Sequence, residues 1–306
     1  MILSNATNIS SFQFYRRLYF YQYIQIYIFM NQFGGRWTEI KMDIFVDYAK
    51  AYLTIMNRQP WAKTLYFDGF AGSGLIDSSD DNDNIKGTAL RILDINDPKP
   101  FDLYYFVEKD ERNKTSLQQK IDHSYFGKNA HVVKADCNQK LIDMSRFLKE
   151  HQEFRALAFI DPYGMTVNWK SIEVLKGLGI DLWILVPTGV GVNRLLKKDG
   201  NIREAWFSKL EQFLGLSRIE IQNHFYSQVT VATLFGEEKF LNKEKSVIQK
   251  IGNLYAERLK TVFEFVSDSF IMRNSTNSIM YHFMMATNNI NALGIANDVI
   301  KPIYKL

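Results

Sequence analysis

The segment at residues 64–74, Thr-Leu-Tyr-Phe-Asp-Gly-Phe-Ala-Gly-Ser-Gly, has the composition of a backbone that binds a ligand. A short apolar run ends in an acid and continues into a glycine-rich turn. A parallel strand presents its carboxyl end to a cofactor in this way, because glycine reaches positive φ and lets a ligand approach the main chain closely. The candidate ligand-binding residues of this turn are Asp68, Gly69, Phe70, Gly72 and Gly74.

The spacing of this turn narrows the class of ligand. It reads Asp-x-Phe-x-Gly-x-Gly, and it matches neither the phosphate-binding pattern Gly-x-x-x-x-Gly-Lys-Ser/Thr nor the dinucleotide pattern Gly-x-Gly-x-x-Gly. The turn resembles the first motif of the methyltransferases that act on nucleic acids. That resemblance implies S-adenosylmethionine as the cofactor.

Acids also follow three later apolar runs. In a Rossmann-like sheet the acid at the end of the second strand holds the ribose hydroxyls, since a carboxylate accepts two hydrogen bonds at once, and Glu108 is that candidate. In the methyltransferase pattern the acid after the third strand, here Asp136, receives the adenine amino group, and the adjacent Cys137 completes the predicted cofactor set. For Glu108 and Asp136 the alternative of a helix N-cap or turn former stays open. The three runs are residues 103–108, 131–136 and 156–164.

The last of these runs ends in Asp161-Pro162-Tyr163-Gly164, which resembles the Asp/Asn-Pro-Pro-Tyr motif of amino-methyltransferases. In that motif a side-chain oxygen and a proline carbonyl accept hydrogen bonds from the target amino group, and the aromatic ring stacks on a flipped base. We expect Asp161 and Pro162 to orient an amino or amide nucleophile and Tyr163 to line the pocket. Here the ring comes one position early, and Gly164 stands in its place. The alternative is a turn that ends a strand, because proline interrupts a strand ladder.

Composition limits the other kinds of site. A single cysteine among 306 residues excludes an internal disulfide framework and a Cys-x-x-Cys site, and it suits a reducing cytoplasm. The five histidines are scattered without ligand spacing, so we expect no metal site. The acids between Asp77 and Asp83 lack calcium-loop spacing and predict a solvated loop. A net charge of +4 is no nucleic-acid footprint by itself.

The first 29 residues differ from the rest of the chain. They contain no acid, and their apolar run from Leu18 to Met30 is too short to span a bilayer, which needs about 20 residues. Three interpretations are open: an upstream extension with Met30 as the natural start, a packed or partner-binding helix, and a weak membrane-surface anchor. We favour the extension, and we expect no membrane association.

The alternation of strands and helices predicts an α/β fold. We expect a Rossmann-like, seven-stranded methyltransferase sheet, mostly parallel, with one antiparallel edge strand and a helical insertion. A helix from Thr38 to about residue 57 should precede the first strand. The predicted divisions are an extension at 1–29, a cofactor-binding core at 30–189, a mostly helical insertion at 190–260 that is the candidate target-recognition region, and closing strands and a helix at 261–306.

The assembled pattern resembles the three-Cys-motif partner proteins, a bacterial group with a methyltransferase-like fold. The resemblance implies a cytoplasmic S-adenosylmethionine-binding protein, a cysteine-motif partner protein, and a mobile-element or phage-defence setting. It covers the chain from about Met30 onward and leaves the oligomeric state open. The segments that carry it are Phe33–Lys41, Tyr66–Gly74, Gly87–Leu90, Phe106–Asp110, Phe159–Gly164, Asp181–Pro187, Asn193-Arg194 and Ala286–Asn288.

Three functions compete at this point. The first is methyl transfer to an amino-type nucleophile on a nucleic acid or another acceptor. The second is a non-catalytic module that binds S-adenosylmethionine or a nucleotide and acts with a second protein, and the third is a nucleotide-using effector. Arg194, Lys197 and Lys198 could contact a phosphate backbone, although a solvated helix face is the plainer interpretation of these charges.

Overall fold

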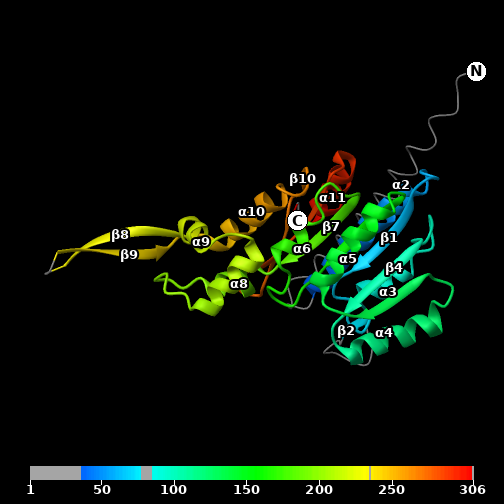
Figure 1. Cartoon of the computed structure of the whole chain (residues 1–306), viewed down its shortest axis with the longest axis horizontal. Helices are drawn as coiled ribbons and strands as arrows, with labels where there is room; N and C mark the ends of the chain where they lie inside the picture. Colours follow the sequence, from blue (N-terminus) through cyan, green and yellow to red (C-terminus); the bar gives the residue numbers. More distant parts are fainter. Residues whose placement is uncertain (1–35, 77–84, 234–235, 305–306) are drawn as a thin grey trace, which may run out of the picture.

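The computed structural model of the chain describes residues 36–76, 85–233 and 236–304 (Figure 1). The predicted N-terminal extension at 1–29 and the acidic segment from Asp77 to Asp83 lie outside these residues. No helix in the described ranges is long and apolar enough to cross a membrane.

A single large sheet organises the described residues. Its strand order is β10-β12-β7-β6-β1-β4-β5, with β11 also pairing with β12. The five strands from β7 to β5 in this order are mutually parallel, and β12 runs antiparallel to β7. The strands are β1 (Lys63–Asp68), β4 (Leu103–Glu108), β5 (Ala130–Lys134), β6 (Phe154–Ile160), β7 (Ile180–Val186), β10 (Phe265–Val266), β11 (Phe270–Arg273) and β12 (Ile279–Thr287).

Helices cover both faces of this sheet because its central strands are apolar on both sides. Alternate residues of one strand enter opposite cores: Leu182 and Ile184 face one, and Trp183 faces the other. The first core contains α5 (Cys137–Glu150), α6 (Trp169–Glu173), α8 (Glu204–Leu214), α9 (Arg218–Phe225) and α10 (Val247–Leu259). The second contains α2 (Arg36–Met56), α3 (Thr88–Leu93), α4 (Glu111–Ser124) and α11 (Ile290–Tyr304).

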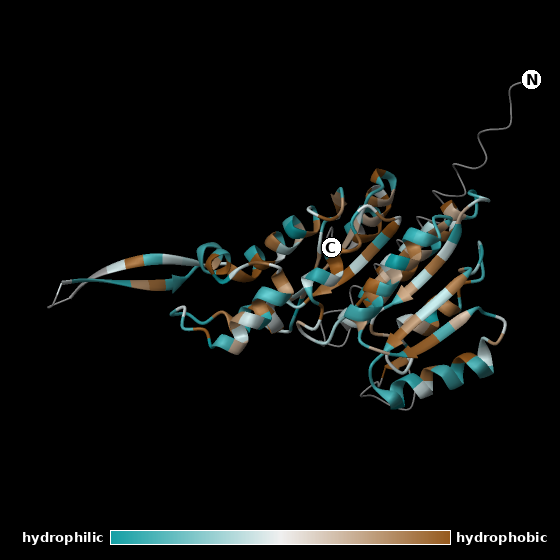
Figure 2. Cartoon of the chain, viewed as in Figure 1, coloured by the Kyte–Doolittle hydropathy of each residue, from teal (hydrophilic) through white to brown (hydrophobic). Residues whose placement is uncertain are grey.

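Two hairpins of different length stand outside the main sheet. The small one pairs β2 (Leu75–Ile76) with β3 (Ile85–Lys86) beside the glycine turn. The long one pairs β8 (Tyr226–Thr233) with β9 (Gly236–Lys243) and extends far from the body, and we call it the arm (Figure 1). Apolar colour concentrates in the strands of the main sheet, whereas α4 and much of β9 are hydrophilic (Figure 2).

The predicted α/β class is confirmed, with three differences in detail. The main sheet of the described residues has eight strands, where the sequence predicted seven. The antiparallel strand β12 lies one position inside the edge, and the edge position is shared by the short strands β10 and β11. Between β10 and β11, Ser267 stays paired with β12: its amide donates to the Met285 carbonyl (2.8 Å), and its hydroxyl accepts a hydrogen bond from the Met285 amide (2.9 Å). Within the predicted insertion the helices are present, but the arm was not anticipated.

Candidate cofactor and acceptor site

Three of the predicted acids lie side by side at one edge of the sheet. Asp68 ends β1, Glu108 ends the neighbouring strand β4, and Asp161 directly follows β6 on the other side of β1. Because these strands are parallel, their carboxyl ends meet at the same edge, where open α/β sheets bind ligands. The sequence order of the acids therefore becomes a spatial cluster.

Asp68 is the buried centre of this cluster. Its side chain is 1% exposed and accepts hydrogen bonds from the Phe70 amide (3.0 Å) and the Tyr66 hydroxyl (3.0 Å). Burial raises the pKa of Asp68 to about 7, and the negative charges of Asp161 and Glu108 add to this rise against the two hydrogen bonds. Asp68 therefore fixes the start of the glycine turn and titrates near neutral pH.

The glycine turn requires glycine for different reasons at different positions. A Cβ on Gly69 would lie 2.6 Å from the Cys137 sulfur and 2.7 Å from Ile160, so this glycine allows close packing. Gly72 has φ +63° and a Cβ there would meet nothing within 4 Å, so the main chain at Gly72 is open to an approaching ligand. Gly74 also has a positive φ, and its carbonyl accepts a hydrogen bond from the Gly87 amide.

Glu108 joins the turn to the second strand. One carboxylate oxygen accepts a hydrogen bond from the Gly72 amide (2.8 Å) and the other from the Asp110 amide (2.7 Å). Each oxygen keeps a further lone pair for another donor. Glu108 thus stands next to the open backbone of Gly72 in the place where the sequence predicts ribose binding.

Asp136 and Cys137 are placed differently from the other predicted residues. Strand β5 ends at Lys134, and Asp136 is the N-cap of α5, where its side chain accepts a hydrogen bond from the Asn138 amide (2.9 Å). The second Asp136 oxygen faces Lys109 at 3.6 Å. The Cys137 thiol is buried, which raises its pKa, and it packs beneath Gly69. The capping interpretation of Asp136 is thus present in the structure, and its contact with adenine stays a prediction.

Asp161 forms an ion pair with Lys41, a residue of α2 that is 120 positions away in the chain. The Lys41 side chain is buried and also lies over the Phe159 ring, 5.9 Å from its centroid. The ammonium group supplies positive charge at an edge that already holds Asp68 and Glu108. It also fixes one Asp161 oxygen and leaves the other free to accept a donor.

Lys41 belongs to one of the resemblance segments, but no role for it was predicted from the sequence. The helical spacing held the signal: Lys41, Phe45, Tyr48 and Tyr52 follow one face of α2, and all four are buried. A lysine in a buried apolar stripe needs a charged partner. Extending that stripe back by one turn would have predicted a carboxylate opposite Lys41.

The two residues after Asp161 have opposite environments. Pro162 is buried, whereas the Tyr163 side chain is 93% exposed, with Gly164 following at φ +63°. Tyr163 therefore presents its ring to solvent, and its predicted role in lining an acceptor pocket stays a prediction.

Tyr281 on β12 was also missed, whereas Arg194 on the three-residue helix α7 (Asn193–Leu195) was considered only as a phosphate contact or a solvated charge. Burial raises the pKa of Tyr281, Asp161 and Tyr163 raise it further, and Arg194 lowers it. These charges act on the Tyr281 phenol from the same neighbourhood. A link between α7, β12 and Asp161 has no signal in the sequence, because it depends on how the elements pack.

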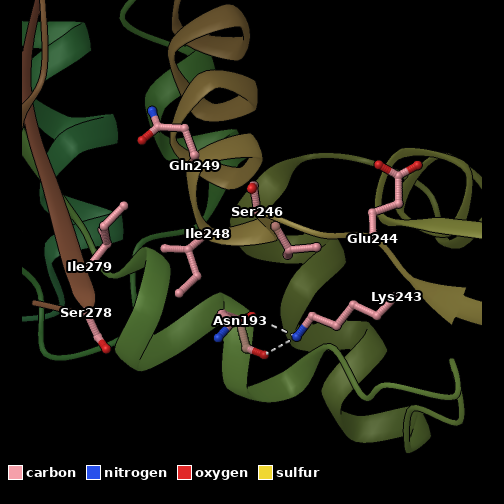
Figure 3. Close-up of a pocket in the computed structure, with 9 residues that line it drawn as sticks. Asn193, Lys243, Glu244, Ser246, Ile248, Gln249, Ser278 and Ile279 are labelled. Carbon is pink, nitrogen blue, oxygen red and sulfur yellow. Dashed lines mark hydrogen bonds between the residues drawn. The ribbon is translucent and has the colours of Figure 1, made fainter. Parts of the chain in front are cut away.

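A cavity of about 440 Å³ lies between the end of β9, the start of α10, the start of β12 and α7 (Figure 3). Lys243 donates to the Asn193 side chain (2.7 Å) beside it. Asp68, Glu108 and Asp161 do not line it. In the described ranges no three His, Cys, Asp or Glu side chains are grouped to hold a metal ion.

The structure of the chain is similar to several solved structures, all at low sequence identity. No protein-family model and no curated protein sequence matches the chain. Protein LPL1258 from Legionella pneumophila, described by the family model DUF519, has a similar structure at 14% identity and a TM-score of 0.43, covering 83% of this chain and 98% of that one.

Two further solved structures are similar over large parts of the chain. Trm1 from Pyrococcus horikoshii, solved with S-adenosyl-L-methionine, matches at 10% identity and a TM-score of 0.43, over 88% of this chain and 59% of its own length. A methyltransferase from Geobacter sulfurreducens matches at 10% identity and a TM-score of 0.28, over 64% of this chain and 78% of that one.

Proposed function

We propose that this chain binds S-adenosylmethionine and transfers its methyl group to an amino-type nucleophile on a nucleic acid or another acceptor. The observation that carries the proposal is the cluster at the carboxyl edge of the sheet: Asp68, Glu108 and Asp161 on adjacent strands, around a turn whose Gly72 backbone is open. When bound, the cofactor supplies a methyl group activated by a sulfonium.

The residues of the turn fit that cofactor. Glu108 holds the turn at Gly72 and keeps lone pairs for the two hydroxyls of a ribose. The absence of any atom within 4 Å of a Cβ on Gly72 gives room for a ligand against the backbone. The Asp68 carboxylate holds the start of the turn by accepting a hydrogen bond from the Phe70 amide.

Asp161 and Pro162, which follow β6, suit an amine as the methyl acceptor. The free oxygen of Asp161 and the carbonyl of Pro162 would accept the two N–H groups, so that the nitrogen lone pair points at the methyl carbon. Lys41 holds Asp161 in position and balances its charge. S-adenosylmethionine would supply the methyl carbon and keep the electron pair of the broken carbon–sulfur bond, and the Asp161 carboxylate would accept the proton that the methylated nitrogen loses.

The test is a calorimetric titration with S-adenosylmethionine of the wild type and of Glu108→Gln and Asp161→Asn. We expect Glu108→Gln to weaken cofactor binding by roughly tenfold, the loss of about 1.4 kcal/mol, because the amide offers one acceptor oxygen where the carboxylate offers two. Asp161→Asn should leave cofactor binding unchanged. A folded wild type that binds no S-adenosylmethionine contradicts the proposal.

A second candidate is the non-catalytic binding module. Two observations favour it: Asp161 is already engaged by Lys41, and the Tyr163 ring stands in solvent without a facing group among the described residues. In this case S-adenosylmethionine binds, but S-adenosylhomocysteine never accumulates with RNA, DNA or protein acceptors. Product formation by the wild type that is lost in Asp161→Ala, while this variant still binds S-adenosylmethionine, decides for the enzyme.

We also propose that the chain belongs with the three-Cys-motif partner proteins, in a bacterial defence or mobile-element setting. In support, segments quoted for that resemblance contact one another in the fold: Thr287 donates to Asp181 (2.5 Å), the Gly87 amide donates to Gly74, and Lys41 pairs with Asp161. Co-purification with any cysteine-motif protein encoded beside this gene tests the partnership. A stable complex supports it, and two proteins that stay separate at micromolar concentration contradict it.

A further inference from the structure

The arm is held firmly at its base. The Lys243 amide donates to the Lys198 carbonyl (3.0 Å), and the Tyr226 hydroxyl donates to the Lys197 carbonyl (2.7 Å). The Lys243 ammonium donates to the Leu196 carbonyl (2.7 Å). Both ends of the hairpin are thus tied to the segment that follows the crevice strand β7.

Five cations gather around this attachment, and we call them the basic root. Four of them are exposed to solvent, and the fifth, Lys243, is half-buried. Among the described residues none of the five has a carboxylate within 4.0 Å, although ion pairs are common elsewhere in the chain. The basic root consists of Arg194, Lys197, Lys198, Arg203 and Lys243.

These charges lie close together. Lys197 and Arg203 both stand over the Trp206 ring, at 4.7 Å and 5.2 Å from its centroid. Burial lowers the pKa of Lys243, and the positive charges of Lys197 and Lys198 lower it further. Asp199 is the single acid within residues 194–203, and its side chain accepts a hydrogen bond from the Asn201 amide (3.0 Å). Like charges without counter-charges attract a polyanion.

The basic root begins at the edge of the candidate site. Strand β7 continues through the π-helical turn η1 (Thr188–Val192) into α7, which carries Arg194. Arg194 and Asp161 both act on the phenol of Tyr281, so the root and the acceptor end of the site share a neighbour. In Figure 1, α8 and the arm extend from the side of the body toward which the arrows of β1 and β4 point.

We propose that the basic root binds the phosphodiester backbone of a single-stranded polynucleotide, whose base reaches Asp161 and Tyr163. This inference rests on the proposed function and names its acceptor class. The exposed ring of Tyr163, next to Asp161 and Pro162, offers a surface on which a planar base can stack. An acidic polypeptide has no such base, so this ring favours a polynucleotide. The root gives affinity for any sequence, and the crevice receives the base.

The test measures fluorescence anisotropy of a labelled mixed-sequence RNA, and of the DNA of the same sequence, with wild type and Lys197→Glu/Lys198→Glu. The matched control is Lys149→Glu/Lys176→Glu, which changes the net charge equally. Lys149 is near the end of α5 and Lys176 precedes β7, so both lie at the opposite edge of the sheet. Both are exposed and form no ion pair among the described residues.

We expect the root variant to bind roughly tenfold more weakly and its salt dependence to flatten by about 0.7 for each phosphate that it no longer neutralises. The control should bind as the wild type does. Equal weakening in both double variants, or no binding of RNA or DNA by the wild type, overturns the proposal. Polyglutamate that competes as well as unlabelled RNA overturns it in favour of an acidic protein.

A second variant guards against misfolding. Arg194→Gln/Lys198→Gln removes two exposed charges that form no ion pair with a described residue, and it should show the same direction of change. Titration of every variant with S-adenosylmethionine separates the two proposals. Polynucleotide binding without cofactor binding retains the root and overturns the proposed methyl transfer, whereas cofactor binding without polynucleotide binding overturns the root. A preference for RNA over DNA identifies a contact to the 2′-hydroxyl.

Discussion

The candidate site and the arm are both built from strands, but they are stabilised in opposite ways. The site stands on β1, β4 and β6, whose residues are buried between two layers of helices. The arm has two strands, and its cross-strand pair Val229 and Phe240 is 40% and 49% exposed. A two-stranded hairpin alone is marginally stable in water, so the arm depends on its base. The core of the fold positions the acids, whereas the arm extends away from the body of the molecule (Figure 1).

Among the residues of the site, Asp68 should have the largest effect on stability, and this effect should depend on pH. Its pKa in the folded chain is about 7 against an ordinary value of 3.8, so between pH 4 and 7 the folded state binds more protons than the unfolded state. This group therefore stabilises the fold below pH 4 relative to neutral pH, and the contribution is lost as the pH rises to 7. Each unit of pKa difference is worth about 1.4 kcal/mol.

The measurement is urea unfolding of wild type and Asp68→Asn across pH 4 to 8. The amide can keep both hydrogen bonds if the Tyr66 hydroxyl becomes the acceptor. We expect the wild type to lose stability relative to the variant as the pH rises. Curves that stay parallel over this range would contradict a buried, titrating Asp68.

Lys41→Met should have the next largest effect. Removing one member of a buried ion pair costs about 3–5 kcal/mol, and the partial exposure of Asp161 places this case at or below the lower end. Lys50→Met is the matched control, because Lys50 is exposed on the same helix. We expect a clear loss of stability in thermal unfolding for Lys41→Met and little change for Lys50→Met. Similar melting of the two variants would remove the structural role of the pair.

Lys41 and the arm also mark the limit of what the sequence could predict. Apolar runs that end in acids identified β1, β4 and β6 and placed Asp68, Glu108 and Asp161 correctly, because buried parallel strands have a strong local pattern. The partner of Lys41 was missed because it lies 120 residues away. The arm was missed because β9 is exposed along most of its length, shows no two-residue alternation of burial, and is rich in Glu and Lys.

Asp136 shows a different limit. The sequence placed it at the end of a strand, and the structure places it two residues later, as the N-cap of α5. Element boundaries follow hydrogen bonds that local composition specifies poorly. The sequence therefore predicted an acid close to the end of this strand, but it placed the end of the strand two residues too late.

Gly69→Ala probes the packing under the site at a smaller scale. The new methyl group would lie 2.6 Å from the Cys137 sulfur, and overpacking of this kind costs about 1–3 kcal/mol. Cys137→Ala should restore part of that loss in the double variant, since it removes the nearest atom. Chemical unfolding of the four proteins of this cycle measures the coupling. Additive effects would mean that Gly69 and Cys137 do not pack as described.

Shortening the arm should have the smallest effect on stability. Replacing residues 229–240 with Asn-Gly joins the paired residues Gln228 and Leu241 through a two-residue turn and keeps Leu241 against Gly200. Because the described side chains of the removed segment are exposed, we expect the free energy of unfolding to change by about 0.5 kcal/mol or less. S-adenosylmethionine binding by calorimetry should match that of the wild type. A large loss of either would show that the arm supports the core after all, and the division between a packed site and an exposed arm would fail.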